Sequence, residues 1–359
     1  MTDIRVNRLV KQWDSIRAVD GVSFTAEAGT LTVLLGPSGC GKSTILRMIA
    51  GLESVDDGEV RIGGRNVTRR DPAKRGISMV FQSYALFPHL DVRENILFGL
   101  KVRRVDVAER ESRLAEAAHM VGLEGLLDRR PAQLSGGQRQ RTALARTIVA
   151  KQPVCLMDEP LSNLDAKLRA EMRDEIRQLQ RRLDLTMIYV THDQTEAMSM
   201  ADQVILLRRG KIEQTGTPEE LYENPLSDFV ARFLGTPAMN LLPVSAVEGA
   251  TAKHVKAAFL GVRPEKLRIC DAGMPVEVSA ADYMGAETIL RMQYGDCTLM
   301  ARIEGRSRAR QGDRLHIAWD ENDAHLFDKD GKRLGGESLS HGPTDDTVRS
   351  GITAFRASP

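Results

Sequence analysis

The segment GPSGCGKST at residues 36–44 constrains the fold of this chain more than any other. It fits the pattern GxxxxGK[ST] and lies between the strand-like run TLTVLLG and the helix-like run ILRMIAGL. In a strand–loop–helix unit of this kind, the glycines let backbone N–H groups close around the β-phosphate of a nucleotide, and the lysine neutralises charge on the β and γ oxygens. The segment therefore predicts a nucleotide site formed by Gly36, Pro37, Ser38, Gly39, Cys40, Gly41, Lys42, Ser43 and Thr44.

Two carboxylates, Asp158 and Glu159, end the apolar run VCLMDE. A continuous apolar run is typical of a strand buried on both faces, and the sites of α/β proteins lie at the carboxyl ends of such strands. Beside a phosphate-binding loop, Asp158 and the hydroxyl of Ser43 are candidates for holding Mg²⁺. Glu159 is a candidate for orienting or deprotonating the water that attacks the γ-phosphate. Without that loop, the pair would be an ordinary solvated strand end.

Three further side chains are candidates on narrower grounds. His192 ends the strand-like run TMIYVTH and could contact the γ-phosphate and Glu159, although a lone histidine is more often structural. Gln82 closes the run ISMVFQ, and its amide could reach Mg²⁺ or water, with an ordinary surface glutamine as the equal alternative. Trp13 could stack on adenine or pack in the core.

A second potential anion site lies in the segment PAQLSGGQRQR at 131–141. Ser135 is a good N-cap for the helix-like run that follows, and a serine-capped, glycine-rich helix start is suited to binding an anion. The chain already has a phosphate loop nearer its N-terminus. The residues alone leave open why one protein would have two.

Residues 1–235 alternate short apolar runs with helical stretches, which indicates an α/β domain with a parallel sheet. Strand-like runs are missing from about 90–151, where Asp91 and Glu94 have the spacing of a capping box. This part predicts a helical subdomain inserted into the α/β domain.

The pattern of predicted secondary structure changes near residue 235. Residues 236–335 contain short alternating strands, with Gly295-Asp296 as a two-residue hairpin turn, and predict a small all-β domain. Residues 336–359 are polar and contain glycine, serine and proline, and predict a flexible tail.

Charge and hydropathy limit the classes of function. The chain has 50 basic and 49 acidic residues, whereas a general nucleic-acid binder is expected to be strongly basic. No apolar run reaches the length of a membrane span, and the charges in MTDIRVNRLVKQW argue against a signal peptide. The four cysteines are scattered without a CxxC pair, which indicates a reduced, cytosolic protein without a disulfide framework or zinc site.

In this order, the segments GPSGCGKST, VFQSYALFPH, LSGGQRQR, CLMDEP, SNLDA and VTHDQTEA resemble those of the ATP-binding subunits of ABC transporters. The likeness covers residues 1–235 and is specific, because LSGGQ is the mark of that superfamily. It implies an α/β P-loop ATPase that uses ATP and Mg²⁺ and forms a homodimer. By position, it implies an adenine-stacking Trp13, a Q-loop Gln82, a signature Ser135–Gln138, a Walker B Asp158, a catalytic Glu159, a D-loop Asp165 and a switch His192. The signature residues of one chain (Ser135, Gly136, Gly137 and Gln138) would then cover ATP held by the P-loop of the other.

The C-terminal segments indicate which group of ABC transporters the chain resembles. GTPAMNLLPV and GVRPEKLRI resemble importers whose ATPase carries an OB-like, TOBE-type regulatory domain, and YMGAETIL and DENDAHLFD are similar to the carbohydrate-uptake group. This likeness implies uptake of sn-glycerol-3-phosphate or a related glycerophosphodiester, with a maltose or other sugar importer, or a polyamine or ferric-ion importer, as alternatives.

The implied partners are two transmembrane permease subunits and an external solute-binding protein, with the ATPase peripheral at the cytoplasmic face of the inner membrane. The apolar segment SYALFPHL at 83–90 lies where the family docks the permease. An ABC ATPase that acts on nucleic acid is the alternative from another class. Its usual second cassette, long coiled coil and basic tracts are missing from this sequence.

Overall fold

The computed structural model describes residues 2–247 and 256–335, so the tail predicted for 336–359 lies outside the described residues. By their contacts the residues form two compact units, Met1–Glu219 and Glu220–Pro359. This boundary lies about 15 residues before the change of predicted secondary structure near residue 235. It places helix α8 (Asp228–Phe233) in the C-terminal unit and falls inside α7 (Pro218–Glu223).

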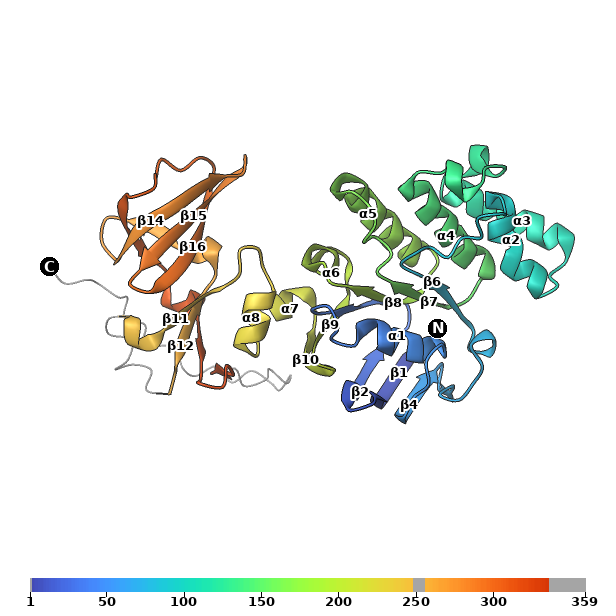
Figure 1. The fold of residues 1–359 in the computed structure, drawn as a ribbon, viewed down its shortest axis with the longest axis horizontal. Helices are drawn as coiled ribbons and strands as arrows, with labels where there is room; N and C mark the ends of the chain where they lie inside the picture. The colour runs from blue at the N-terminus through green and yellow to red at the C-terminus, as the bar shows by residue number, and fades with distance from the viewer. Residues whose placement is uncertain (1, 248–255, 336–359) are drawn as a thin grey trace, which may run out of the picture. The chain divides into compact units, whose positions relative to one another are not determined.

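The first unit is built on a six-stranded sheet in the order β10-β9-β3-β8-β7-β6 (Figure 1). All neighbours pair in parallel except β10, which is antiparallel to β9. Every residue of β3, β7 and β8 is buried, as the continuous apolar runs predicted. The five parallel strands confirm the predicted α/β domain with a parallel sheet. The six strands are β3 (Leu31–Leu35), β6 (Ile77–Val80), β7 (Val154–Asp158), β8 (Thr186–Thr191), β9 (Gln203–Arg208) and β10 (Lys211–Gly216).

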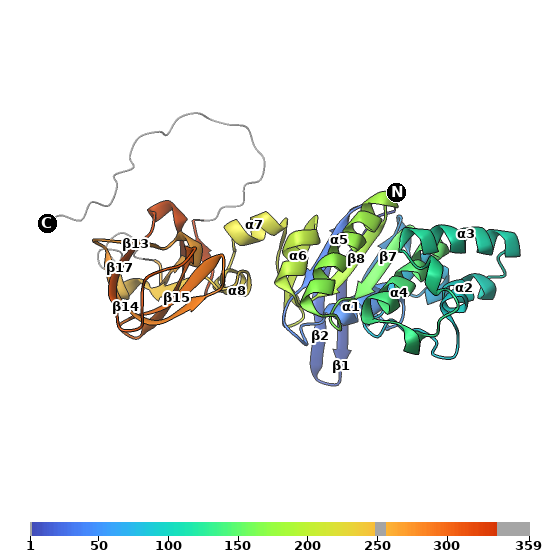
Figure 2. The same cartoon turned by 90° about the horizontal axis from the view of Figure 1, so that it is seen from above.

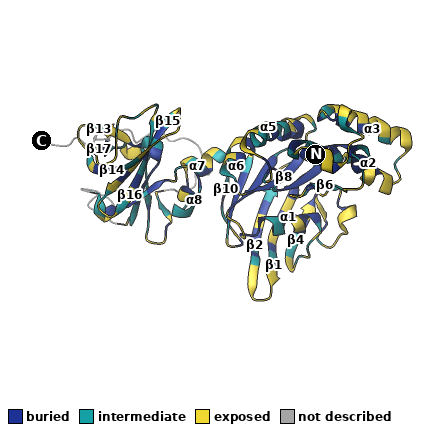
Figure 3. Cartoon of the chain, turned by 45° about the horizontal axis from the view of Figure 1, so that its top comes forward, coloured by how far each residue is buried: buried dark blue, intermediate teal, exposed yellow. Residues whose placement is uncertain are grey.

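A second, antiparallel sheet has the order β2-β1-β4-β5. Helix α1 (Lys42–Ala50) lies between the two sheets, and a single apolar core that includes Leu9, Ile45 and Ile188 joins all three layers. Figure 3 shows the central strands buried and the tip of the β1–β2 hairpin exposed. The strands are β1 (Ile4–Trp13), β2 (Ile16–Ala26), β4 (Asp57–Ile62) and β5 (Arg65–Asn66).

The predicted helical subdomain is present between β6 and β7, where α2 and α3 lie side by side (Figure 2). Acidic or hydroxyl side chains cap its helices: Asp91 accepts a hydrogen bond from the Glu94 amide, and Asp106 accepts one from the Ala108 amide. Helices α5 and α6 cover the face of the parallel sheet opposite to α1 (Figure 1). The bounds are α2 (Val92–Val102), α3 (Val107–Met120), α4 (Gly136–Ala150), α5 (Ala166–Arg182) and α6 (Gln194–Met200).

The C-terminal unit contains two antiparallel sheets, β11-β12-β18-β19 and β13-β17-β14-β15-β16, around an apolar core that includes Leu290 and Ile317. The predicted hairpin is confirmed, because Tyr294 pairs with Cys297 across Gly295-Asp296. The strands are β11 (Asn240–Pro243), β12 (Phe259–Val262), β13 (Arg268–Cys270), β14 (Met274–Tyr283), β15 (Glu287–Tyr294), β16 (Cys297–Glu304), β17 (Arg314–Ala318), β18 (Ala324–Phe327) and β19 (Arg333–Leu334). Within the described ranges, the helices are all too short or too polar to span a membrane.

The buried guanidinium of Arg263 ties α7 and α8 to this unit. It donates to the carbonyls of Tyr222 (2.7 Å), Ala231 (2.9 Å) and Leu234, and it stacks 3.9 Å from the Tyr222 ring. Burial lowers the pKa of Arg263 from its usual value. These bonds satisfy carbonyls at the end of α8, which explains why residues 220–235 belong with the β-domain.

Replacing Arg263 by methionine should destabilise the C-terminal unit. The change leaves three carbonyls without their donor, and we expect a loss of about 2–4 kcal/mol in the free energy of unfolding. Urea unfolding followed by Trp319 fluorescence measures this loss. Arg268→Met, at an exposed position of β13, is the matched control and should leave the midpoint nearly unchanged. Equal midpoints for the two variants would contradict the assigned role of Arg263.

Candidate active site

The P-loop (residues 36–44) connects the end of β3 to the start of α1 and requires glycine at two positions. Gly36 and Gly41 have φ values of 150° and 102°. A Cβ at Gly36 would lie 2.4 Å from the Leu207 carbonyl oxygen, and one at Gly41 would lie 2.4 Å from that of Ala18. The backbone can therefore follow this path only without side chains at these two positions.

Lys42 and Cys40 are both buried in the P-loop. The Lys42 ammonium donates to the carbonyls of Gly36 (2.8 Å) and Pro37 (2.9 Å), so the loop is closed around its own lysine. Burial raises the pKa of the Cys40 thiol, which outweighs the opposing effect of nearby Lys42. Cys40 therefore stays protonated and fills space in the loop.

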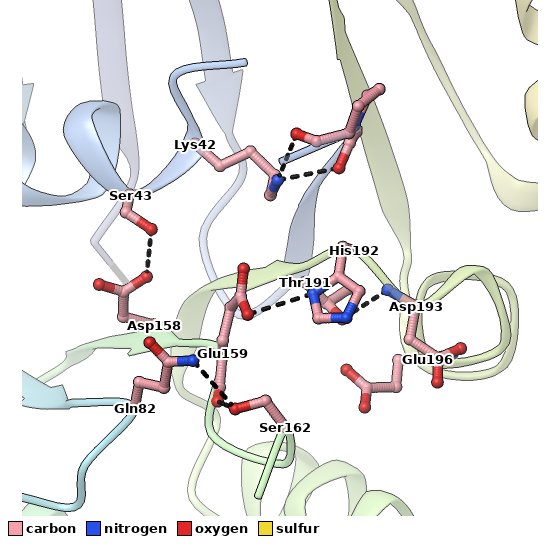
Figure 4. A network of polar contacts seen from close by, with 12 residues as sticks. Lys42, Ser43, Gln82, Asp158, Glu159, Ser162, Thr191, His192, Asp193 and Glu196 are labelled. Atoms are coloured by element: carbon pink, nitrogen blue, oxygen red, sulfur yellow. Dashed lines mark hydrogen bonds and ion pairs between the residues drawn. The ribbon is translucent and has the colours of Figure 1, made fainter. Parts of the chain in front are cut away.

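Ser43 and Asp158 bring a hydroxyl and a carboxylate together beside this loop (Figure 4). The Ser43 hydroxyl donates to Asp158 Oδ1 over 2.6 Å, and Asp158 is only 4% exposed at the end of β7. The guanidinium of Arg47 lies 3.8 Å from the other oxygen of this carboxylate. Hard oxygen donors in this position fit Mg²⁺, which is usually held by one or two protein oxygens plus substrate phosphates.

Glu159 follows Asp158 with a strained backbone. Its φ of 45° lies in the left-handed region that non-glycine residues rarely adopt, and its amide donates to the Val190 carbonyl over 3.1 Å. The carboxylate Oε2 lies 3.1 Å from Nδ1 of His192 at the end of β8 (Figure 4). The structure thus brings Glu159 and His192 together at one edge of the parallel sheet, as the sequence predicted.

Gln82 and Trp13 occupy less expected positions. The Gln82 amide donates to the Ser162 hydroxyl over 3.3 Å, and that hydroxyl donates to the Glu159 carbonyl over 3.0 Å, so Gln82 contacts the loop after β7. Trp13 is 47% exposed next to the β1–β2 turn, with the Lys11 ammonium 5.8 Å from its ring. Core packing of Trp13 is therefore wrong, and its ring is accessible for stacking.

The signature segment (Ser135–Gln138) forms the start of α4 as a complete capping box. The backbone N–H of Gln138 donates to the Ser135 hydroxyl over 3.3 Å, and the backbone N–H of Ser135 donates to Gln138 Oε1 over 2.9 Å. A Cβ on Gly136 would lie 3.0 Å from Leu164, and one on Gly137 would lie 3.0 Å from Leu168. The predicted N-cap is confirmed, and the two glycines let α4 approach α5 closely.

Asp165, the predicted D-loop residue, is the N-cap of α5. Its side chain accepts from the Leu168 amide over 3.0 Å. The same side of the unit contains polar residues that sequence reasoning missed: Ser162, Arg169, Asp193 and Glu196 line a cavity of about 30 Å³ together with Glu159. Asp193 could have been found, because Asp193 and Glu196 have capping-box spacing just after His192. Nothing in the sequence distinguishes Arg169 from the other arginines of α5.

Two acids beside His192 have shifted pKa values. Burial raises the pKa of Glu196, and the Tyr189 hydroxyl donates to its carboxylate over 2.9 Å. Burial also opposes ionisation of Asp193, but hydrogen bonds from the backbone N–H groups of Thr195 and Glu196, together with those from the side chains of Thr195 and Arg169, outweigh it and lower the pKa. Asp193 is therefore a charged cap of α6, and Glu196 is a buried carboxyl group beneath it.

The fold and this site define a P-loop ATPase of the ABC class. Residues 19–162 match the family described as ABC transporter, and residues 260–327 match the TOBE domain. The chain is 49% identical to the sn-glycerol-3-phosphate import ATP-binding protein UgpC 3 of Agrobacterium fabrum, over 89% of this chain and 96% of that protein. The chain belongs to the ABC transporter family, as an ATP-binding protein with a C-terminal TOBE domain.

Other relatives differ in the solute that their names give. UgpC of Cereibacter sphaeroides is 46% identical over 93% of this chain and 100% of its own length. The sulfoquinovosyl glycerol transport ATP-binding protein SmoE of Agrobacterium fabrum is 45% identical over 91% of this chain and 98% of its length. Among solved structures, the dimeric bacterial ABC transporter cassette MJ0796 is 30% identical with a TM-score of 0.55, covering 60% of this chain and 98% of that one. A post-hydrolysis dimer of MJ0796 bound to ADP and Pi has a TM-score of 0.54 at 29% identity, with the same coverage.

Proposed function

We propose that this ABC ATPase energises an importer of sn-glycerol-3-phosphate or a related glycerophosphodiester. The observation that carries the ATPase assignment is the pairing of two contacts beside an intact P-loop, Ser43 with Asp158 and Glu159 with His192. The solute is supported by the names of the UgpC relatives, at 44–49% identity. The similar identity of SmoE makes sulfoquinovosyl glycerol the first alternative, ahead of maltose and other sugars.

Each part of the site has a distinct task in hydrolysis. Ser43 and Asp158 would hold Mg²⁺, which supplies positive charge to the β and γ phosphate oxygens when bound. Lys42 provides a second cation in the P-loop, and Trp13 offers an exposed ring for the adenine. Glu159 orients the attacking water and accepts its proton, while the imidazole of His192 fixes the carboxylate in position.

A second copy of the chain completes each site. Within the described residues, the hydrogen bonds of Ser135–Gln138 stay inside the start of α4, and none reaches the P-loop of the same chain. The positive end of α4 is suited to a phosphate, so in a head-to-tail dimer it covers ATP bound by the partner. Two chains would then bury two nucleotides between them, and ATP would close the pair.

The remaining partners follow from the importer assignment. Closure drives two transmembrane permease subunits that receive solute from an external binding protein, and the ATPase sits peripherally at the cytoplasmic face of the membrane. Within the proposed permease-docking segment 83–90, Tyr84 is buried, and the Phe87 ring makes a tilted contact with Phe98 at 4.4 Å between centroids. The segment is therefore only partly exposed. Phe98 itself is 38% exposed and extends this apolar surface.

Uptake measurements test the solute assignment. Cells that lack this chain should lose uptake of radiolabelled sn-glycerol-3-phosphate, and expression of the intact chain should restore it, whereas the Glu159→Gln variant should not. Parallel assays with a glycerophosphodiester, sulfoquinovosyl glycerol and maltose rank the alternatives. Unchanged sn-glycerol-3-phosphate uptake, with loss of another solute, would reassign the importer and leave the ATPase in place.

A further inference from the structure

Arg169 connects two loops of the site that are far apart in the sequence. It lies in the first turns of α5, and its two terminal nitrogens make different contacts. Nη2 donates to the Leu164 carbonyl over 3.0 Å, just before the D-loop residue Asp165. Nη1 donates to the Asp193 carboxylate over 3.2 Å, just after the switch residue His192. One planar guanidinium therefore sets the spacing between these loops.

The contact of Arg169 with the Leu164 carbonyl links it to the signature segment, because Leu164 packs against the start of α4. Leu164 is buried, and its side chain lies 3.0 Å from where a Cβ of Gly136 would be. A shift of the Leu164 backbone would move the side chain that packs against the start of α4. Arg169 thereby supports the helix end proposed to cover the partner's ATP.

On the other side, the contact leads to the chain's own catalytic pair. Asp193 uses its second oxygen to cap α6, accepting from the Thr195 amide over 2.7 Å. The preceding residue, His192, lies 3.1 Å from the Glu159 carboxylate. Because Asp193 is held by both α6 and Arg169, the backbone that presents His192 has a fixed direction.

The surroundings of Arg169 leave its guanidinium few alternatives. Its Nε is buried and has no hydrogen-bond partner among the described residues. Arg169 lines the cavity of about 30 Å³ together with Glu159 and Glu196. A cavity of this volume has room for one water molecule. The charge of Arg169 thus faces two carboxylates, those of Asp193 and the buried Glu196, and a rotation would break both loop contacts.

We propose that Arg169 is a positioning residue that couples the two ATP sites of the dimer through each chain. This inference rests on the proposed head-to-tail dimer. The signature segment serves the partner's nucleotide and the Glu159–His192 pair serves the chain's own. Arg169, which contacts the loops leading to both, makes the geometry of one site depend on that of the other.

Mixed dimers of the full-length chain test the coupling. Two differently tagged copies are co-expressed, one of which carries Glu159→Gln, and dimers with one of each are purified. Only the site whose glutamate is intact can hydrolyse ATP. Because the other site keeps its ATP and holds the dimer closed, phosphate release is followed in a single turnover. Arg169→Met is then placed either in the chain that supplies this glutamate or in the chain that supplies the signature to it. We expect the rate of this single turnover to fall about tenfold or more in both placements. ATP binding to the single chain should be unchanged.

The controls separate coupling from a local or structural role. Arg182→Met, at an exposed position in the last turn of α5, should leave turnover unchanged in both placements. If Arg169→Met does not fold, Arg169→Lys carries the same test, because a lysine ammonium lacks the planar two-nitrogen fork that sets the spacing between the two loops. A loss in only one placement, or in neither, overturns the inference. Dimers of the unchanged chain that do not hydrolyse ATP would overturn the proposed function, and the inference with it.

Discussion

Replacing Glu159 by glutamine should reduce ATP turnover at least about 100-fold while leaving ATP binding intact, since a general base contributes 10²–10⁴ to the rate. Glutamine has nearly the same shape, so the contact with His192 and the strained backbone at Glu159 should survive. It cannot accept the proton of the attacking water. ATP-bound dimers should therefore accumulate, and size-exclusion chromatography with ATP and Mg²⁺ measures them beside a phosphate-release assay.

The matched control is Glu171→Gln, at an exposed position of α5, which should hydrolyse ATP at the rate of the intact chain. A Glu159→Gln variant with normal phosphate release would show that another group activates the water. A variant that neither binds ATP nor forms dimers would instead indicate damage to the loop between β7 and α5. Nucleotide binding therefore has to be measured with turnover.

Replacing Ser135 by arginine should block dimer closure and turnover without weakening ATP binding to the single chain. The arginine adds bulk and positive charge at the positive end of α4. It also removes the hydroxyl that would face the partner's nucleotide, and a donor placed at developing charge is worth on the order of 10²–10³ in rate. Fluorescent-nucleotide titration and phosphate release separate the two effects.

Ser135→Ala distinguishes loss of the helix cap from obstruction of the surface. Removing the cap costs about 1 kcal/mol of helix stability, so this variant should still form dimers and keep more activity than Ser135→Arg. Unchanged turnover in Ser135→Arg would count against the shared-site dimer. Equal losses in both variants would mean that the hydroxyl, and not the accessible surface, is what matters.

The parallel sheet could be predicted from sequence because its strands are buried on both faces and follow continuous apolar runs. The antiparallel sheet of β1, β2, β4 and β5 could not. Strand β1 has register shifts between Val6 and Leu9, and Arg8 has a φ of 47°. A bulge of this kind breaks the period of two on which strand recognition depends.

The site was predicted where residue type and position along a strand carry the chemistry. Lys42, Asp158, Glu159 and His192 all lie at the P-loop or at strand ends, and the structure brings the last two into contact. Arg169 was missed because its role depends on a contact with Asp193 across two loops. The bond from Gln82 to Ser162 was missed for the same reason, since side-chain direction in a loop is set by tertiary neighbours.

Gly136 and Gly137 belong to the signature segment proposed to cover the partner's ATP, and they also pack against the α5 region of their own chain. A Cβ on either residue would lie 3.0 Å from a leucine of the α5 region, so any side chain there requires that leucine to shift, whether or not a nucleotide is bound. A descendant of this chain that lost hydrolysis would still have this close packing of α4 on α5 at both positions. The glycines of such a motif therefore report an intact fold, whereas Ser135 and Glu159 are the positions at which decay of the activity would first become visible.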